Sequence, residues 1–147
     1  MSMTMMTTAS RKMTTIGIFV SSVQKELNEE RAAIRDYIKT DPLLRLYFET
    51  FLFEDLPALD RKPDELYLNE VDGCSIYLGI FGNEYGSENK QGFSPTELEY
   101  ERATEKSKYR LIFVKGKDDS TRHPKMQSLI SRAKHNVVRK PFTDTDV

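Results

Sequence analysis

The chain has 147 residues and a net charge of −1, and 38% of its residues are hydrophobic, with 8 Phe and 7 Tyr among them. This size and composition predict one folded domain with its own core. The charge gives no direct signal for nucleic-acid binding, and no apolar run reaches the ~20 residues that a membrane span needs. The single cysteine, Cys74, excludes an internal disulfide framework, so we expect a soluble cytoplasmic protein.

The beginning and the end of the chain carry little sign of regular structure. Residues 1–13 are polar and rich in Met, and they lack the apolar centre of a signal peptide. We interpret them as a disordered leader and residues 14–147 as a single α/β domain. Phe142-Thr143-Asp144 is typical of a helix start, yet the chain ends at Val147. We therefore expect this domain to be the N-terminal module of a longer protein.

Short apolar runs alternate with amphipathic segments along the domain. Strands are predicted at Thr15–Val20, Leu46–Phe53, Ser75–Phe81, Arg110–Val114 and, more briefly, Val137–Val138. Helices are predicted at about Val23–Lys39, Asp64–Val71, Pro95–Ser107 and Pro124–Ala133. This alternation favours a three-layer α/β fold around a five-stranded parallel sheet. The expected strand order is the flavodoxin-like 2-1-3-4-5, in which ligands bind beyond the carboxyl ends of strands 1 and 3.

The predicted helix that begins at Pro95 is the most informative segment. Ser94 is a typical N-cap, and Glu97, three residues later, completes a capping-box pattern. Helical spacing places four residues on one mostly apolar face: Thr96, Glu99, Tyr100 and Ala103. A carboxylate on an inward face is costly unless it is used, so Glu99 is the first catalytic candidate and Glu97 the second. An ordinary surface glutamate and a plain capping role are the respective alternatives.

Residues at the expected ligand edge could hold a nucleotide. Ser21 and Ser22 end the first strand, where hydroxyl and backbone N–H groups can bind a phosphate or ribose, or simply form an N-cap. Tyr85 lies between Gly82 and Gly86, in a loop after the third strand, and could stack on a base. A solvent-exposed loop tyrosine is the alternative interpretation of Tyr85.

Other features are weaker. Asp72 could accept a ribose hydroxyl, although a turn before Gly73 explains it as well. The loop after the third strand lacks the Gly-Lys-Ser/Thr of a Walker motif, so the chain should not hydrolyse ATP by itself. His123 and His135 are isolated from each other and from other metal-ligand types, and we predict no metal site.

Three ordered motifs resemble a known family: Ile18–Arg31, Glu70–Gly86 and Ser94–Tyr100. They are similar to an uncharacterised domain related to TIR domains and nucleoside 2-deoxyribosyltransferases, over about Thr15–Val147. The resemblance implies a TIR-like α/β fold. It also implies a position N-terminal to other modules of a longer protein. Such modules are NTPase and repeat modules, or the ATP-binding module of RecG-helicase-like proteins. TIR relatives often need assembly for activity, which suggests a homo-oligomer.

In the enzymatic relatives, a Glu on the helix after the third strand acts at the anomeric carbon of a nucleoside or NAD. A Thr three residues earlier and a small residue four later accompany it, and Thr96, Glu99 and Ala103 match this spacing. The Gly or Trp-Cys neighbours of that glutamate in the relatives are absent here. The resemblance thus implies a nucleotide-binding or interaction module in a larger ATP-dependent, helicase-like or signalling/defence protein. The alternative is an N-glycosidase that acts through Glu99 on NAD or a nucleoside, with no cofactor required.

Overall fold

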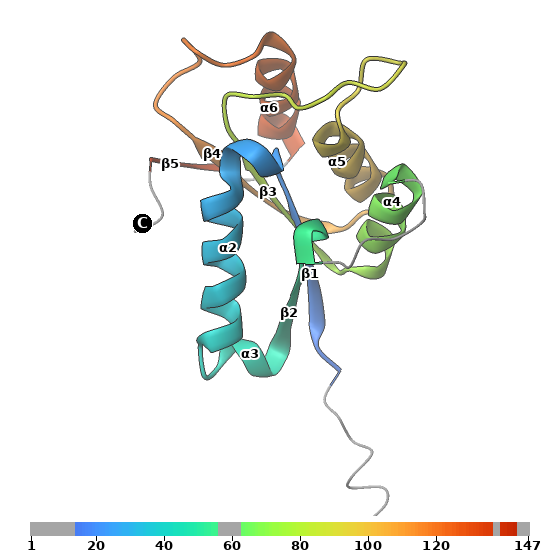
Figure 1. The fold of residues 1–147 in the computed structure, drawn as a ribbon, viewed down its shortest axis with the longest axis vertical. Coiled ribbons are helices and arrows are strands. Elements are labelled where there is room, and N and C mark those ends of the chain that lie inside the picture. The colour runs from blue at the N-terminus through green and yellow to red at the C-terminus, as the bar shows by residue number, and fades with distance from the viewer. Residues whose placement is uncertain (1–13, 56–62, 137–138, 144–147) are drawn as a thin grey trace, which may run out of the picture.

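The computed structural model describes residues 14–55, 63–136 and 139–143 of the chain (Figure 1). These described residues contain five strands: β1 (Ile16–Ser21), β2 (Phe48–Phe51), β3 (Ile76–Phe81), β4 (Tyr109–Lys115) and β5 (Arg139–Phe142). All neighbouring strands pair in parallel, in the order β2-β1-β3-β4-β5. The predicted α/β class and the order 2-1-3-4-5 are therefore confirmed.

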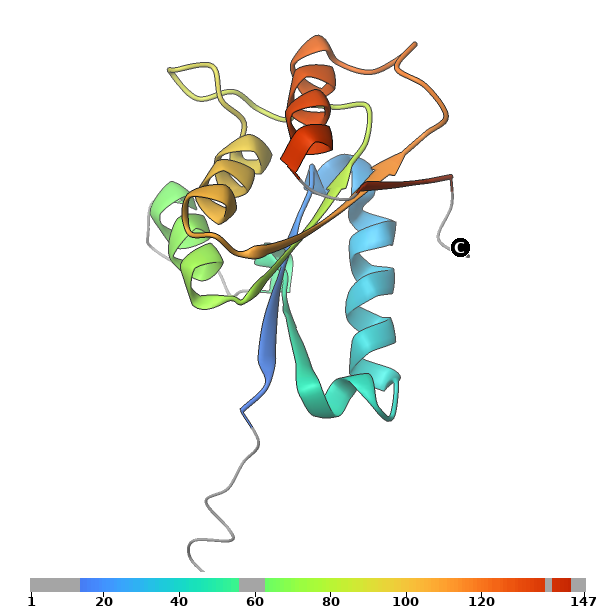
Figure 2. The same ribbon diagram turned by 180° about the vertical axis from the view of Figure 1, so that it is seen from behind.

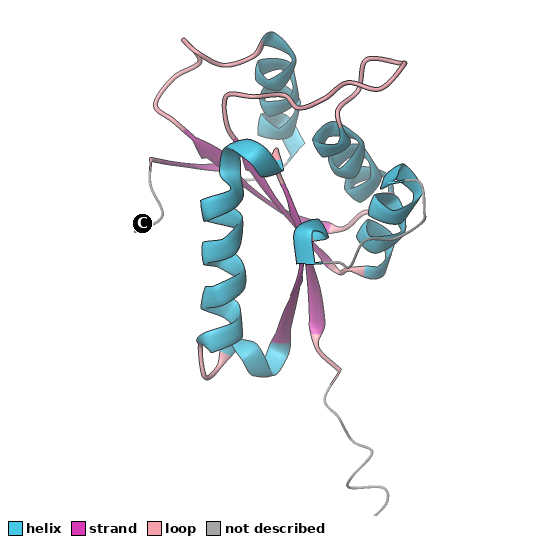
Figure 3. Ribbon diagram, viewed as in Figure 1, coloured by secondary structure: helices cyan, strands magenta, loops and turns pink. Residues whose placement is uncertain are grey.

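Helices alternate with the strands along the chain (Figure 3). They are α2 (Gln24–Thr40), α3 (Leu44–Tyr47), α4 (Pro63–Gly73), α5 (Pro95–Glu105), α6 (Pro124–Asn136) and the short 3₁₀ helix η1 (Phe53–Asp55). The long helix α2 lies on one face of the sheet, and α4, α5 and α6 lie on the other (Figures 1 and 2). The result is the three-layer arrangement expected from the sequence.

Each face of the sheet has its own core cluster. Phe19, Tyr77 and Phe81 pack with residues of α4, α5 and α6 on one face. Ile18 and Val20 alternate with Phe19 along β1 and pack beneath α2 on the other face. Both faces are covered, which is why the central strands are apolar almost throughout.

The second strand is shorter than predicted. Leu46 belongs to α3 and Phe53 to η1, so only Phe48–Phe51 pair with β1. The side chain of Asp41 accepts hydrogen bonds from the backbone N–H groups of Leu43 and Leu44, both at 2.9 Å. An acidic side chain that accepts from the N–H groups two and three residues later starts a helical turn. The apolar pattern of the segment did not reveal this turn.

The C-terminal part of the domain also differs from expectation. The predicted strand at Val137–Val138 and the leader at 1–13 lie outside the described residues. Phe142 does not begin a helix: it ends β5, pairs with Lys115 and packs against the core beneath α2. Pro141 lies within β5, and an edge strand such as β5 tolerates a proline.

Candidate functional site

A pocket of about 230 Å³ lies at the carboxyl edge of the sheet, where the strand order reverses between β1 and β3. Its walls come from the end of β1, the start of α2, η1, the loop after β3 and the start of α5. The lining residues are Phe19, Val20, Ser22, Val23, Gln24, Arg31, Phe53, Gly86, Ser87, Pro95, Thr96 and Glu99. Ser22, Gly86, Thr96 and Glu99 are sequence-predicted site residues, and the fold brings them together here.

The carboxylate of Glu99 is buried at this pocket. The hydroxyl of Ser21, the last residue of β1, donates a 2.7 Å hydrogen bond to Oε1 of Glu99. Only 6% of Glu99 is exposed, and the neighbours Thr96, Tyr100 and Ala103 on the same helix face are buried as predicted. Burial raises the pKa of Glu99 to about 7, against the opposing effects of the Ser21 hydrogen bond and the positive charge of Arg31.

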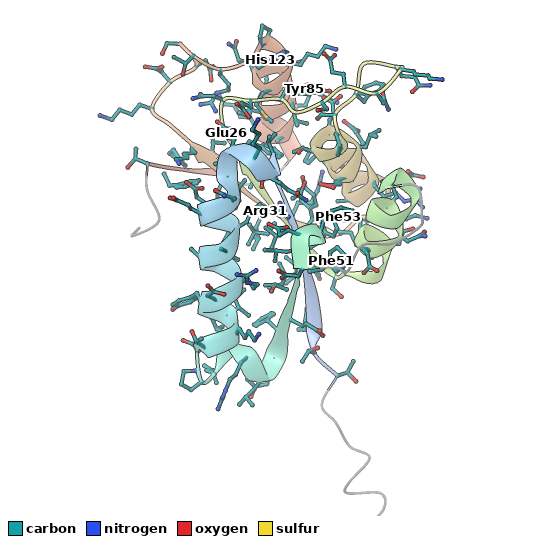
Figure 4. All side chains as sticks on the ribbon, in the orientation of Figure 1. Glu26, Arg31, Phe51, Phe53, Tyr85 and His123 are labelled. Carbon is teal, nitrogen blue, oxygen red and sulfur yellow. The ribbon has the colours of Figure 1, made fainter. Side chains whose placement is uncertain are left out.

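Arg31 reaches into the site from α2 and is 2% exposed. Its Nη1 donates to Oγ of Ser22 at 2.9 Å, while Nε and Nη2 each donate to a carboxylate oxygen of Glu54 at 2.7 Å. Figure 4 shows Arg31 pointing from α2 toward the turn that carries Phe53. Burial tends to raise the pKa of Glu54, but the hydrogen bonds and charge of Arg31 outweigh it and leave that pKa below its usual value.

Sequence reasoning missed Arg31, although a signal was present. The inward stripe of α2 includes Leu27 and Ile34. Arg31 lies four residues after the first and three before the second, so it occupies the same stripe. The argument that singled out Glu99, a charge on an apolar face, applies equally to Arg31. Glu54 stands in a short turn and has no comparable signal.

Two helices begin at the pocket and present their N-termini to it. The N-cap residue of α2, Val23, provides no side-chain hydrogen bond, so the first N–H groups of this helix lack a side-chain cap. In α5, the hydroxyl of Ser94 accepts from the backbone N–H of Glu97, as the capping pattern predicted. Helix N-termini carry partial positive charge, which favours an anionic ligand between them.

Glu97 and Tyr85 do not line the pocket. The hydroxyl of Tyr85 donates to Oε2 of Glu97 at 3.0 Å and accepts from the backbone N–H of Ser94 at 3.2 Å. The carboxylate of Glu97 also binds Arg132, on α6. The buried ring of Tyr85 stacks on His123, with centroids 5.4 Å apart, and is not free to stack on a base (Figure 4). These contacts stabilise the start of α5 and leave Glu97 outside the site.

Asp72 lies at the opposite edge of the sheet. It precedes β3, and the residues before a parallel strand lie at the amino edge, away from the ligand crevice. Its carboxylate accepts two hydrogen bonds from Arg102, at 2.7 and 2.8 Å. These hydrogen bonds hold the pKa of Asp72 below its usual value. The residue joins α4 to α5 rather than contacting the pocket.

Gly82 follows β3 but faces the first turn of α2. A Cβ at this position would lie 2.6 Å from Oε1 of Glu26. The Glu26 carboxylate accepts the backbone N–H groups of Asn83 at 2.8 Å and Glu84 at 3.1 Å. Gly82 is thus required for a close approach that anchors the loop, whereas Gly86, with φ of +93°, is the loop glycine at the pocket.

Two classes of site are absent from the part of the chain that the structure describes. Within it, no three or more His, Cys, Asp or Glu side chains cluster in a way that could hold a metal ion. Among the same residues, no helix combines the length and hydrophobicity needed to cross a bilayer.

Comparison with known proteins supports the fold and identifies the family. The structure of a CMP N-glycosidase from Clostridium botulinum, BcmB, is similar to this chain with a TM-score of 0.53 and 10% identity, over 88% of this chain and 91% of that one. At this identity the likeness concerns the fold alone. No curated protein sequence matches the chain significantly. A family model described as a domain of unknown function, DUF4062, matches residues 17–146, and the chain therefore belongs to the DUF4062 family.

Proposed function

We propose that this domain cleaves the N-glycosidic bond of a nucleotide, with Glu99 as the catalytic carboxylate. The observation that carries the proposal is the buried Glu99 at the pocket, with Oε1 fixed by the hydroxyl of Ser21. Its other oxygen, Oε2, takes no hydrogen bond among the described residues. A carboxylate held on one oxygen can present the other to an anomeric carbon.

The reaction requires only a nucleotide and water. The bond between C1′ of the sugar and the base nitrogen breaks, and its electron pair leaves with the base. Oε2 of Glu99 then stabilises, or bonds to, the electron-poor C1′. A water molecule attacks C1′ and releases the carboxylate; its oxygen and one hydrogen stay on the sugar as a hydroxyl group, and its other proton goes to the departing base. The products are the free base and a sugar phosphate or, from NAD, neutral nicotinamide, ADP-ribose and a proton released to solvent.

The N-terminus of α2 supports an anionic group in the substrate. It lacks a side-chain cap and begins at the pocket, whereas the charge of Arg31 in the pocket wall is matched by Glu54. Thr96 lies one turn before Glu99, and its hydroxyl makes no hydrogen bond to any described residue, so it can bind a sugar hydroxyl. The similarity of the fold to a CMP N-glycosidase adds support for a nucleotide, either a nucleoside 5′-phosphate or NAD.

The test is release of free base from CMP, other ribonucleoside 5′-monophosphates and NAD, followed by chromatography. We expect release from at least one of these by the wild type and a loss of about 100-fold or more in Glu99→Gln. Glu105→Gln is the matched control, because Glu105 lies on the same helix with its side chain 67% exposed. Equal rates in wild type and Glu99→Gln, or no release from any of these substrates, would overturn the proposal.

A second candidate is a nucleotide-binding or interaction module within a larger ATP-dependent, helicase-like or signalling protein. Large apolar side chains are exposed at the end of α2 and along α3, far from the pocket: Tyr37, Leu43, Leu46 and Tyr47. Such a cluster favours contact with another part of the polypeptide or a second copy. Calorimetric binding of a nucleotide to wild type and Glu99→Gln alike, with no base released by either, would select this function.

A further inference from the structure

The hydroxyl of Tyr77, on β3, is a buried polar group without an obvious role. It forms no hydrogen bond of ordinary geometry to any described residue. Burial of a hydroxyl group without a partner is unfavourable, and such groups in folded proteins call for an explanation. Phenylalanine would give the same ring without this cost, so the oxygen itself points to a function.

The fold directs this hydroxyl toward the candidate catalytic carboxylate. In the pairing of β1 with β3, Phe19 lies opposite Tyr77 and Ser21 opposite Gly79. A Cβ at residue 79 would lie 2.9 Å from Cε1 of Tyr77, so the tyrosine ring extends over the glycine toward the carboxyl edge of the sheet. The absence of a side chain at Gly79 therefore makes room for Tyr77 to approach Ser21.

Aromatic neighbours hold the ring of Tyr77 in this direction. The ring of Phe19 stacks against it with centroids 6.5 Å apart, and the ring of Tyr100 meets it edge-on at 6.0 Å. The hydroxyl end lies near enough to Ser21 and Glu99 for both to affect the pKa of Tyr77. A small shift of this end would complete a hydrogen bond to the hydroxyl oxygen of Ser21.

We propose that Tyr77 is a positioning residue for Glu99 and acts through Ser21. The Tyr77 hydroxyl donates to Oγ of Ser21, and the Ser21 hydroxyl donates to Oε1 of Glu99. Each of these two hydroxyl groups donates one hydrogen bond, and the carboxylate of Glu99 is the final acceptor. Hydrogen bonds in such a chain strengthen one another, most of all when the final acceptor is ionised.

The charges around Glu99 are consistent with this series of hydrogen bonds. Glu99 is approached by Ser21 from β1, Arg31 from α2, Glu54 from η1 and Tyr77 from β3. Arg31 favours the ionised carboxylate and Glu54 opposes it. Burial, followed by the charge of Glu99, raises the pKa of Tyr77 well above 10, so its hydroxyl remains a donor throughout the pH range in which Glu99 titrates. The inference deepens the proposed function, since it concerns the same carboxylate.

The first test follows the titration of Glu99 directly and needs no turnover. In protein carrying ¹³C-labelled glutamate carboxyl groups, the Glu99 signal is the one lost in Glu99→Gln. We expect Tyr77→Phe to raise the pKa of Glu99 by about half a unit to one unit, which is less than the effect of a direct hydrogen bond to a charged group, because Tyr77 acts through Ser21. Tyr100→Phe, which removes a hydroxyl from the ring that touches Tyr77, should leave it unchanged. An unchanged pKa in Tyr77→Phe, or an equal shift in Tyr100→Phe, overturns the proposal.

A double variant tests whether the effect passes through Ser21. In a Ser21→Ala variant the series of hydrogen bonds from Tyr77 to Glu99 is already interrupted. The further change Tyr77→Phe should therefore leave the pKa of Glu99 at the value that it has in Ser21→Ala. A further shift of the same size would mean that Tyr77 acts on Glu99 without Ser21, and it would overturn the relay.

Thermal unfolding separates this role from simple packing. At pH 5, where Glu99 is protonated, Tyr77→Phe should unfold close to the wild-type temperature, because the hydrogen bond that it removes is not strengthened by an ionised acceptor. At pH 8.5, where Glu99 is ionised, the same variant should unfold at a lower temperature than the wild type. Equal destabilisation at both pH values would indicate a packing role alone and contradict the proposal. Absence of base release would overturn the proposed reaction without changing these results.

Discussion

The hydroxyl of Ser21 and the carboxylate of Glu99 meet at 2.7 Å, although 78 residues separate them in the sequence. One lies at the end of the inner strand β1, and the other lies on α5, which follows the neighbouring strand β3 in the sequence. The fold buries this acid at the carboxyl edge of the sheet, and burial raises the pKa of Glu99 to about 7, although the hydrogen bond from Ser21 acts in the opposite direction. Several measurable properties depend on it.

Glu99→Gln should stabilise the fold at high pH and have little effect at low pH. The pKa of Glu99 is about 7 in the folded chain and 4.5 in the unfolded chain, so the folded state binds more protons between these values. Stability therefore falls as pH rises from about 4.5 to 7, by up to about 3 kcal/mol. Urea unfolding at pH 5 and pH 8 would measure this. A difference between variant and wild type that is the same at both values would contradict the shifted pKa.

Base release, where it occurs, should increase with pH through about 7. The proposed reaction uses the ionised form of Glu99, whose fraction rises over that range. The dependence of kcat/KM on pH reports the free enzyme and is the appropriate measurement. A rate that is already constant at pH 5 would show that an unperturbed carboxylate, or another group, limits the reaction.

Arg31→Met should reduce stability by about 3 kcal/mol, because it leaves Glu54 and Ser22 without their buried partner. It should also raise the pKa of Glu99 further, since Arg31 favours its ionised form. Arg35→Met is the matched control. Arg35 pairs with Asp55 at the surface, where an ion pair contributes less than about 1 kcal/mol. Urea unfolding measures the loss of stability in each variant. Equal losses would show that the buried ion pair of Arg31 contributes no more to stability than the surface ion pair of Arg35.

Gly79→Ala should destabilise the domain by about 1–3 kcal/mol, because the new methyl group would lie 2.9 Å from the ring of Tyr77. It should also displace that ring from Ser21 and shift the titration of Glu99. Gly73→Ala is the control, since a Cβ at Gly73 meets nothing within 4 Å. Thermal unfolding of the two variants should differ clearly. Equal stability of Gly79→Ala and Gly73→Ala would mean that the ring of Tyr77 can move away from a methyl group at residue 79 without cost, which contradicts the close packing of Gly79 and Tyr77.

Tyr85→Phe should cost about 1–2 kcal/mol, because the backbone N–H of Ser94 loses its acceptor and Glu97 loses a donor. Tyr109→Phe, with Tyr109 79% exposed, should change stability little. Chemical unfolding of both variants gives the comparison. No difference between them would mean that water replaces the Tyr85 hydroxyl at the start of α5.

The sequence was sufficient for the strand order of the sheet and for the inward face of α5, because both follow from the pattern of apolar residues. Apolar runs predicted β1 and β3, and spacing along the helix predicted that Glu99 faces inward. The site was less predictable where contacts join distant segments. No local pattern shows that Tyr85 contacts Glu97, or that Glu54 contacts Arg31, since each pair depends on how a loop is placed. Arg31 itself could have been found, because it interrupts an apolar stripe.

The contact between β1 and α5 also bears on how the protein is made. Ser21 leaves the ribosome long before Glu99, and β1 gains its partner β3 only after the intervening helices have been synthesised. Until β3 has paired with β1 and α5 has packed on the sheet, Glu99 is an ordinary solvated acid. Its altered acidity is therefore a property of the finished tertiary structure, and a nascent or misassembled chain does not carry it.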